Sequence, residues 1–239
     1  MIYVISISSE MLNDTNDYQN IVTEIKQTIN CEDKVIIVTS SFKDEVPNTL
    51  EEILKININT NQNIIDLILS QIEIKSAGWL GVCLEKNNLQ CKIMTPYQIP
   101  ILINDHTIEY VEMNNILSSL AKSNFIIIPG NYAINRTLSS IYYGENNAEY
   151  LALYIYKELK VRKLKTSCHI YKKYDKISLT DGNDYKTNEY VDVINKDNFQ
   201  VSKNALSNLF TQNTIDLITK YKLNITLGNK LLKGTTIAL

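Results

Sequence analysis

Two short runs of β-branched residues, separated by a helical pattern, constrain the fold more than any other feature. Residues 2–7 form one apolar run, and residues 34–39 form a second one with polar flanks. Between the runs, apolar residues recur at helical spacing at Ile21, Val22, Ile25 and Ile29. A short continuous apolar run is typical of a parallel strand buried on both faces, so this order predicts a βαβ unit.

The alternation of strand and helix patterns continues along the chain. Further helices are predicted at 61–87 (one long or two abutting), 111–122, 148–160 and 202–222, and further strands at 90–94, 124–130, 166–171, 223–227 and 235–239. The pattern predicts an α/β fold with a single open, mainly parallel sheet and helices on both faces. One domain over residues 1–239 is expected, with a shift of lobe near residue 160.

Bulk composition excludes two classes of partner. The 239 residues carry 24 basic and 26 acidic side chains, for a formal net charge of −2. No charge excess therefore favours nucleic acid or an anionic membrane. No apolar run is expected to reach the length of a membrane span, and residues 1–7 are too short for a signal peptide. The four cysteines lack C-x-x-C spacing, so no metal site or disulfide framework is predicted, and we expect a cytoplasmic protein.

A glycine and two asparagines precede the helix predicted at 148–160. Gly144, Asn146 and Asn147 permit left-handed turns and leave N–H groups free at the helix start, as α/β proteins do where they hold an anion. In a simpler interpretation, Asn146 or Asn147 caps the helix and Glu149 lies in its first turn. The sequence leaves both interpretations open.

The order of motifs resembles the catalytic domain of aspartokinases, in the amino acid kinase family. The family's first strand runs into Lys-Phe-Gly-Gly, which falls on residues 6–9, and its Ser-x-Gly-Glu is similar to residues 70–73. The helix start Gly-Arg-Gly-Gly-Ser-Asp-Tyr-x-Ala falls on residues 144–152, and a closing Gly-Thr-x-Ile is kept at residues 234–237. The resemblance covers nearly the whole chain, without the regulatory domains of many aspartokinases.

The resemblance implies a three-layer αβα sandwich with a substrate-side lobe at 1–160 and a nucleotide-side lobe at 161–239. It also implies two sets of site residues. The nucleotide set is Ser6, Ser8, Ser9, Gly144, Asn146, Asn147, Lys172, Lys173 and Asp181. The substrate set is Ser70, Glu73, Arg136 and Glu145.

The residues that carry phosphate chemistry in the family are replaced. Phosphoryl transfer needs cations or backbone amides that stabilise the charge on the moving group. The family's first-strand lysine is Ser6 here, and the arginine that holds the substrate carboxylate is Glu145, which would repel it. Lys172 and Lys173 could supply charge to a nucleotide, and Arg136 could replace the lost arginine. In the alternative interpretation, all three are solvated surface side chains.

Glu73 is the strongest candidate for a retained ligand contact. In aspartokinases the acid at this position contacts the substrate's amino group, and the resemblance gives Glu73 that role. Without the resemblance, a glutamate on a helix is a solvated or salt-bridged side chain. Among other residues, His106 is expected in a turn, His169 in strand packing and Trp79 in the core.

Two functions compete at this point. The family's lysine (Ser6 here), its glycines (Ser8, Ser9, Asn146 and Asn147 here) and its arginine (Glu145 here) are lost together. This joint loss predicts a non-catalytic or strongly diverged relative. Such a relative binds a small amino acid or carboxylate, or pairs with a partner in a homo- or hetero-oligomer. The alternative is an active phosphotransferase that uses ATP and Mg²⁺ to phosphorylate aspartate or another small acid. A new reaction in the same cleft is a third possibility.

Overall fold

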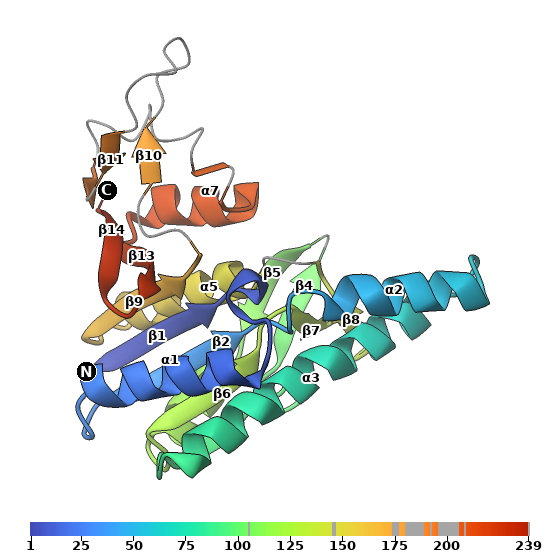
Figure 1. Ribbon diagram of the computed structural model, residues 1–239, viewed down its shortest axis with the longest axis horizontal. Coiled ribbons are helices and arrows are strands. Elements are labelled where there is room, and N and C mark those ends of the chain that lie inside the picture. The colour runs from blue at the N-terminus through green and yellow to red at the C-terminus, as the bar shows by residue number, and fades with distance from the viewer. Residues whose placement is uncertain are drawn as a thin grey trace.

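An eight-stranded sheet organises the chain in the computed structural model (Figure 1), which describes residues 1–104, 106–144, 147–173, 177–179, 189–191, 193–195, 206–207 and 209–238. In spatial order its strands are β12 (Val193–Ile194), β14 (Lys233–Ile237), β13 (Ile225–Lys230), β9 (Thr166–Tyr171), β1 (Ile2–Ile7), β2 (Lys34–Thr39), β6 (Phe125–Pro129) and β3 (Cys91–Ile93). The pairing is antiparallel between β13 and β14 and parallel between the other neighbours. The predicted mainly parallel α/β sheet is confirmed.

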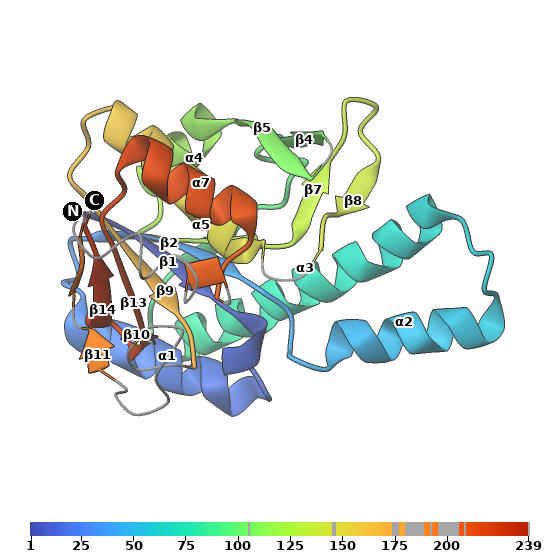
Figure 2. The ribbon, with the colours of Figure 1, turned by 90° about the horizontal axis from the view of Figure 1, so that it is seen from above.

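Helices cover both faces of this sheet (Figure 2), as the three-layer prediction requires. Because alternate residues of a strand point to opposite faces, neighbouring residues of β1 enter different cores. Val4 packs with residues of α4 (Met113–Leu120), α5 (Ala148–Val161) and α7 (Gln212–Tyr221). Ile5 and Ile7 pack with residues of α1 (Thr15–Thr28) and α3 (Gln62–Lys86).

The prediction of a single sheet is wrong. A second, four-stranded sheet has the order β5 (Thr107–Val111), β4 (Ile101–Asn104), β7 (Tyr132–Ile134) and β8 (Ser140–Tyr142), and β10 (Ile177–Leu179) pairs with β11 (Glu189–Val191). Strands of three to five residues are too short to show a period-two pattern. The helix predicted to begin at residue 111 begins at Met113, because Val111 still belongs to β5.

The structure also defines the extent of the helices predicted at 61–87 and 202–222. Residues 61–87 give one continuous helix that passes through both Gly78 and Gly81. In the C-terminal segment, α7 begins only at Gln212, since Thr211 caps it by accepting a hydrogen bond from the N–H of Thr214. Gly234 lies inside β14 with a φ of +122°, where a Cβ would approach the Leu227 carbonyl oxygen too closely.

A helical hairpin projects from the body in both views (Figure 1 and Figure 2). It is made of α2 (Glu45–Ile56), which no sequence pattern predicted, and the first half of α3. By length and composition α3 could cross a membrane, contrary to expectation, but more than half of the apolar stretch is buried in the fold, as in a core helix. Trp79 on α3 was expected in the core and is instead 44% exposed.

The eight-stranded sheet runs through both predicted lobes. β9 and β13 follow residue 160, and β9 pairs with β1 along its whole length. The division into a substrate-side and a nucleotide-side lobe stays a prediction. All four cysteines are free.

Candidate functional site

Polar residues gather at one edge of the large sheet, where the parallel strands β1, β2, β6 and β9 end. Ser8 follows β1, Ser41 lies two residues beyond β2, Asn131 lies two residues beyond β6 and Lys172 follows β9. In parallel α/β sheets, ligands bind in the crevice at the carboxyl ends of the strands. This edge is therefore the candidate site.

The N-terminus of α5 lies directly against these strand ends. A Cβ on Gly130 would come within 2.4 Å of the Ala148 Cβ and 3.0 Å of the Thr39 carbonyl oxygen, so only glycine fits there. The buried Tyr143 donates a hydrogen bond from its hydroxyl to the Gly130 carbonyl oxygen at 2.7 Å. These contacts bring the predicted helix start and the end of β6 together.

Glu73 reaches this edge from α3 and has no exposed surface. Its Oε1 accepts hydrogen bonds from the Ser41 N–H (3.4 Å) and the Asn131 side-chain amide (3.2 Å), and its Oε2 accepts one from the Asn131 N–H (3.4 Å). Burial raises the pKa of the carboxyl to about 7, although the hydrogen bonds from Asn131 and Ser41 partly offset the shift. Among the described residues, no cation lies within ion-pairing distance of Glu73.

Asn131 links this carboxyl to the start of α5. Its side-chain oxygen accepts a hydrogen bond from the Asn147 N–H at 3.1 Å. Asn147 occupies the N-cap position, but its side chain makes no capping bond to the helix. Its amide donates instead to the carbonyl oxygens of Tyr143 (2.7 Å) and Gly144 (3.2 Å), which stabilises the turn in which Gly144 has a φ of +102°. A capping role for the Asn147 side chain is therefore wrong.

Lys172 also lies at this edge of the sheet. It is a buried cation, and its partner is buried too. Its Nζ lies 2.9 Å from Glu149 Oε1 and 3.9 Å from Glu10 Oε1. The side chains of Lys172 and Glu149 are only 4% and 1% exposed. The charge of Lys172 is thus balanced inside the protein.

Ser6 and Ser8 are buried on β1 and just after it. Among the described residues, neither hydroxyl has a hydrogen-bond partner. Ser9 begins the short 3₁₀ helix η1 (Ser9–Met11), which carries Glu10 toward the end of β9. Two predicted nucleotide residues thus leave unused polar atoms on and just after β1, the strand that pairs with β9.

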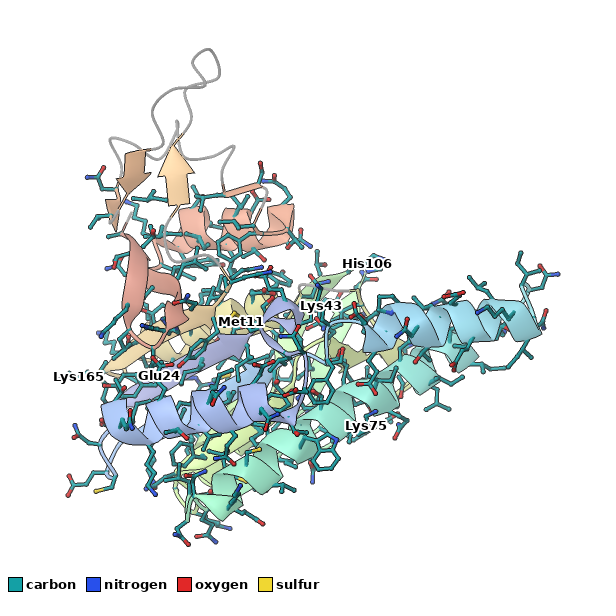
Figure 3. All side chains as sticks on the ribbon, viewed as in Figure 1. Met11, Glu24, Lys43, Lys75, His106 and Lys165 are labelled. Atoms are coloured by element: carbon teal, nitrogen blue, oxygen red, sulfur yellow. The ribbon has the colours of Figure 1, made fainter. Side chains whose placement is uncertain are left out.

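Lys173 is exposed and lies on a separate, open cavity. Its backbone N–H donates to Glu10 Oε1 at 3.3 Å. The cavity has a volume of about 400 Å³ and is lined by Glu10, Met11, Asn13, Asp17, Lys43 and Lys173. Figure 3 shows Met11 and Lys43 close together near the end of β1.

Two residues of the predicted substrate set lie in different environments. Ser70 is buried one turn before Glu73 on α3, and its hydroxyl donates to the Asp66 carbonyl oxygen at 2.6 Å. Arg136 lies in the turn between β7 and β8, where its Nη2 is 3.0 Å from Glu109 Oε2 and its side chain is 78% exposed. Asn131 therefore links Glu73 to Asn147, with Ser70 one turn away from Glu73 on α3, whereas Arg136 is paired with Glu109.

Three predicted residues, Glu145, Asn146 and Asp181, lie outside the described residues. Within the described part of the chain, no three His, Cys, Asp or Glu side chains form a group that could hold a metal ion. Sequence reasoning missed the roles of Asn131, Ser41 and Tyr143. The position of Asn131 and Ser41 just after buried strands was the available signal.

Comparison with known proteins identifies a family and a relative that this chain resembles in sequence. The sequence profile described as the amino acid kinase family matches residues 1–228. An aspartokinase from Rickettsia bellii (strain RML369-C) is 28% identical over 160 residues, covering 64% of this chain and 38% of the relative. The chain therefore spans well under half of the length of this relative.

Solved structures show the same fold. Aspartate kinase from Synechocystis superposes with a TM-score of 0.81 at 15% identity, covering 100% of this chain and 40% of that one. Aspartokinase III from E. coli, in complex with aspartate and ADP, gives a TM-score of 0.76 at 12% identity, covering 100% and 64%.

Proposed function

The chain belongs to the amino acid kinase family, and from this premise we propose that it is an aspartokinase-like protein that binds a small amino acid through Glu73 and has lost efficient phosphoryl transfer. The division of labour between a substrate-side lobe at 1–160 and a nucleotide-side lobe at 161–239 is part of the same proposal.

One observation carries the ligand-binding half of the proposal. Glu73 is fully buried and hydrogen-bonded to Asn131 and Ser41, and no described cation balances its charge. A buried carboxylate without a cation is costly, and a ligand ammonium group bound against it would remove that cost. Because Glu145 replaces the family's carboxylate-binding arginine, the amino group is the better anchor for the ligand. Aspartate, which the E. coli structure contains, is the first ligand to test.

Access to Glu73 requires a local movement. Asn131, which donates to the carboxyl, and Asn147, whose N–H donates to Asn131, are also buried. A ligand therefore reaches the carboxyl only when the hydrogen bonds that Asn131 makes to Glu73 and Asn147 rearrange.

The second half of the proposal, the loss of efficient phosphoryl transfer, rests on Ser6 of β1 and on Lys172, which follows β9. The position of the family's first-strand lysine is Ser6, and the buried Lys172 is paired with Glu149. A cation whose charge is already balanced by a carboxylate at 2.9 Å stabilises a transferring phosphoryl group less than an unpaired one.

An active phosphotransferase is the second candidate, and a specific observation favours it. Lys172 provides a buried cation just after β9, and the adjacent strand β1 carries the unpartnered hydroxyl of Ser6 and is followed by that of Ser8, a donor set that suits phosphate oxygens. ATP with Mg²⁺ would then be required, with Lys172 and those hydroxyls toward the phosphates. The described residues contain no group of three His, Cys, Asp or Glu side chains that could hold a metal ion, and no step is derived through Mg²⁺.

Two assays on the same protein separate these functions. In calorimetric titration, L-aspartate is expected to bind the wild-type chain and to lose at least about tenfold in affinity in the Glu73→Gln variant. The Glu85→Gln variant, which changes an exposed acid on the same helix, is the control and should bind as the wild type does. With ATP, Mg²⁺ and aspartate, trapping of an acyl phosphate by hydroxylamine should give no product. Product that depends on Lys172 would establish the active alternative.

A further inference from the structure

The peptide group between Ser40 and Ser41 lies in a buried network of hydroxyl groups. Its N–H is the Ser41 donor that binds Glu73 Oε1 at 3.4 Å. Its carbonyl oxygen has three hydroxyl oxygens within hydrogen-bonding distance, those of Ser76 (2.8 Å), Tyr18 (3.1 Å) and Thr39 (3.1 Å). Because a peptide group is planar, the hydroxyls that hold its oxygen also fix the direction of its N–H.

Two of these hydroxyls come from helices that pack on the same face of the large sheet (Figure 1). Tyr18 lies on α1, and Ser76 lies on α3 one turn after Glu73. Neither side chain has any exposed surface. Tyr18 also contacts the hydroxyls of Thr39 (3.0 Å) and Ser76, and its ring packs on Phe42 with 5.6 Å between centroids. The two helices thus hold the segment that follows β2.

The orientation of this peptide plane is the favourable one for every group around it. A carbonyl oxygen has two lone pairs, so two of the three hydroxyl protons bind the Ser40 oxygen and the third binds a neighbouring hydroxyl. If the plane were turned over, these protons would lose their acceptor. The carbonyl oxygen would then face the Glu73 carboxylate, which repels it. Both changes are costly in a buried site.

From this geometry we propose that Tyr18 and Ser76 are positioning residues, which hold the Ser40–Ser41 peptide plane so that its N–H stays directed at Glu73. Their bonds to the carbonyl oxygen also polarise the peptide group and strengthen the bond that its N–H donates. That N–H stabilises the ionised carboxylate, which is the form that a ligand ammonium group binds. This consequence for binding rests on the proposed function, in which Glu73 anchors the ligand.

The ionisable groups that face Glu73 among the described residues keep a constant charge near neutral pH. Burial raises the pKa of Tyr18 and that of Tyr143 above the ordinary value of 10.0, so both hydroxyls stay neutral. On α5, the carboxylate of Glu149 is balanced by Lys172 at 2.9 Å. A change in the titration of Glu73 therefore reports on the hydrogen bonds that the carboxyl accepts.

The test is an NMR titration of the Glu73 carboxyl carbon in the 239-residue chain, with the signal assigned by its absence from Glu73→Gln. The pKa of Glu73 in the wild type is about 7. Tyr18→Phe and Ser76→Ala should each raise this pKa by about half to one pH unit, and the double variant should raise it further. In calorimetric titration at roughly pH 7, each single variant should bind L-aspartate about two- to fivefold more weakly. The affinities should converge at roughly pH 9, where Glu73 is ionised in all of them.

Tyr156→Phe and Ser123→Ala are the matched controls. Each removes a hydroxyl from a buried side chain that donates to a backbone carbonyl oxygen, that of Asn224 at 3.0 Å for Tyr156 and that of Phe125 at 3.1 Å for Ser123. Neither hydroxyl touches the Ser40–Ser41 peptide plane. Both controls should keep the pKa of Glu73 at its wild-type value, even if they lower the free energy of unfolding as much as the test variants do.

The NMR titration separates the positioning role from the proposed function. An unchanged pKa of Glu73 in Tyr18→Phe, Ser76→Ala and the double variant would overturn the proposal, and so would an equal rise in the controls. A rise confined to the test variants supports it. If the wild type then fails to bind L-aspartate, the positioning role stands and the proposed ligand-binding function is the part that fails.

Discussion

Replacing Glu73 by glutamine should change how the stability of the protein depends on pH. In the folded chain, burial raises the pKa of this carboxyl to about 7 from its ordinary value of 4.5. Between these two pH values the folded state holds the proton and the unfolded state has released it. The free energy of unfolding therefore falls as the pH rises through this window, and the penalty is complete above pH 7.

The magnitude follows from the same two values. A carboxyl whose pKa rises from 4.5 to about 7 removes about 2 to 3 kcal/mol of stability between roughly pH 5 and pH 8. Glutamine is neutral at every pH and retains an oxygen that accepts from Ser41 and the Asn131 side chain. It gives up the 3.4 Å bond from the Asn131 N–H, a loss of about 1 kcal/mol that does not vary with pH.

The assay is reversible urea unfolding, followed by far-ultraviolet circular dichroism, for the wild type and the Glu73→Gln variant across this range. Taking the difference between the two curves cancels every other titrating group. The variant should gain about 2 to 3 kcal/mol relative to the wild type on going from roughly pH 5 to pH 8. Glu85→Gln on the same helix should track the wild type. A difference that stays constant across the range would refute the assignment of Glu73 as a buried, cation-free carboxyl.

Three further predictions concern the same edge of the sheet. Lys172→Met should lower the free energy of unfolding by about 3 to 5 kcal/mol, because it leaves Glu149 buried without its partner. In urea unfolding, the double variant with Glu149→Leu should recover most of that loss. Equal losses in the single and double variants would contradict the pairing. The exposed Lys173→Met should change stability by less than about 0.5 kcal/mol. Burial lowers the pKa of His169 to about 3 from 6.5. Between roughly pH 7 and pH 5 the free energy of unfolding of the wild type should therefore fall by about 2 kcal/mol relative to that of His169→Phe. A difference between the two proteins that stays constant over this range would contradict the prediction.

The large sheet could be predicted because each of its central strands is a continuous apolar run. Residues 2–7, 34–39 and 166–171 form β1, β2 and β9 with the predicted bounds. Their ends fix the candidate site, since parallel strands finish at one edge. His106 in its turn and His169 inside a strand were also predicted correctly.

The second sheet and the pairings at the site could not be predicted in this way. Tertiary contacts decide where a short strand forms, and β7 and β8 contain three residues each. Whether a lysine is solvated or buried depends on what faces it in space. Lys172 and Lys173 are neighbours in sequence, yet one is paired with Glu149 inside the fold and the other is exposed.

Glu73 shows the same limit. Its position on a helix fits a solvated acid as well as a ligand contact, and only the strand ends beside it distinguish the two. The amide groups of Ser41 and Asn131 converge on the carboxyl from segments 32 and 58 residues away in sequence. No local pattern contains that information.

The affinity for L-aspartate at two pH values tests the central claim most directly. A ligand ammonium group binds ionised Glu73, which is a minor form below its pKa of about 7 and the main form above it. Calorimetric titration should therefore show affinity about tenfold higher at roughly pH 8 than at pH 6, with net proton release on binding at the lower pH. The Glu73→Gln variant should show weak binding that does not depend on pH. Equal affinity of the wild type at the two pH values, or unchanged binding by the variant, would contradict the role of Glu73 as the ligand's anchor.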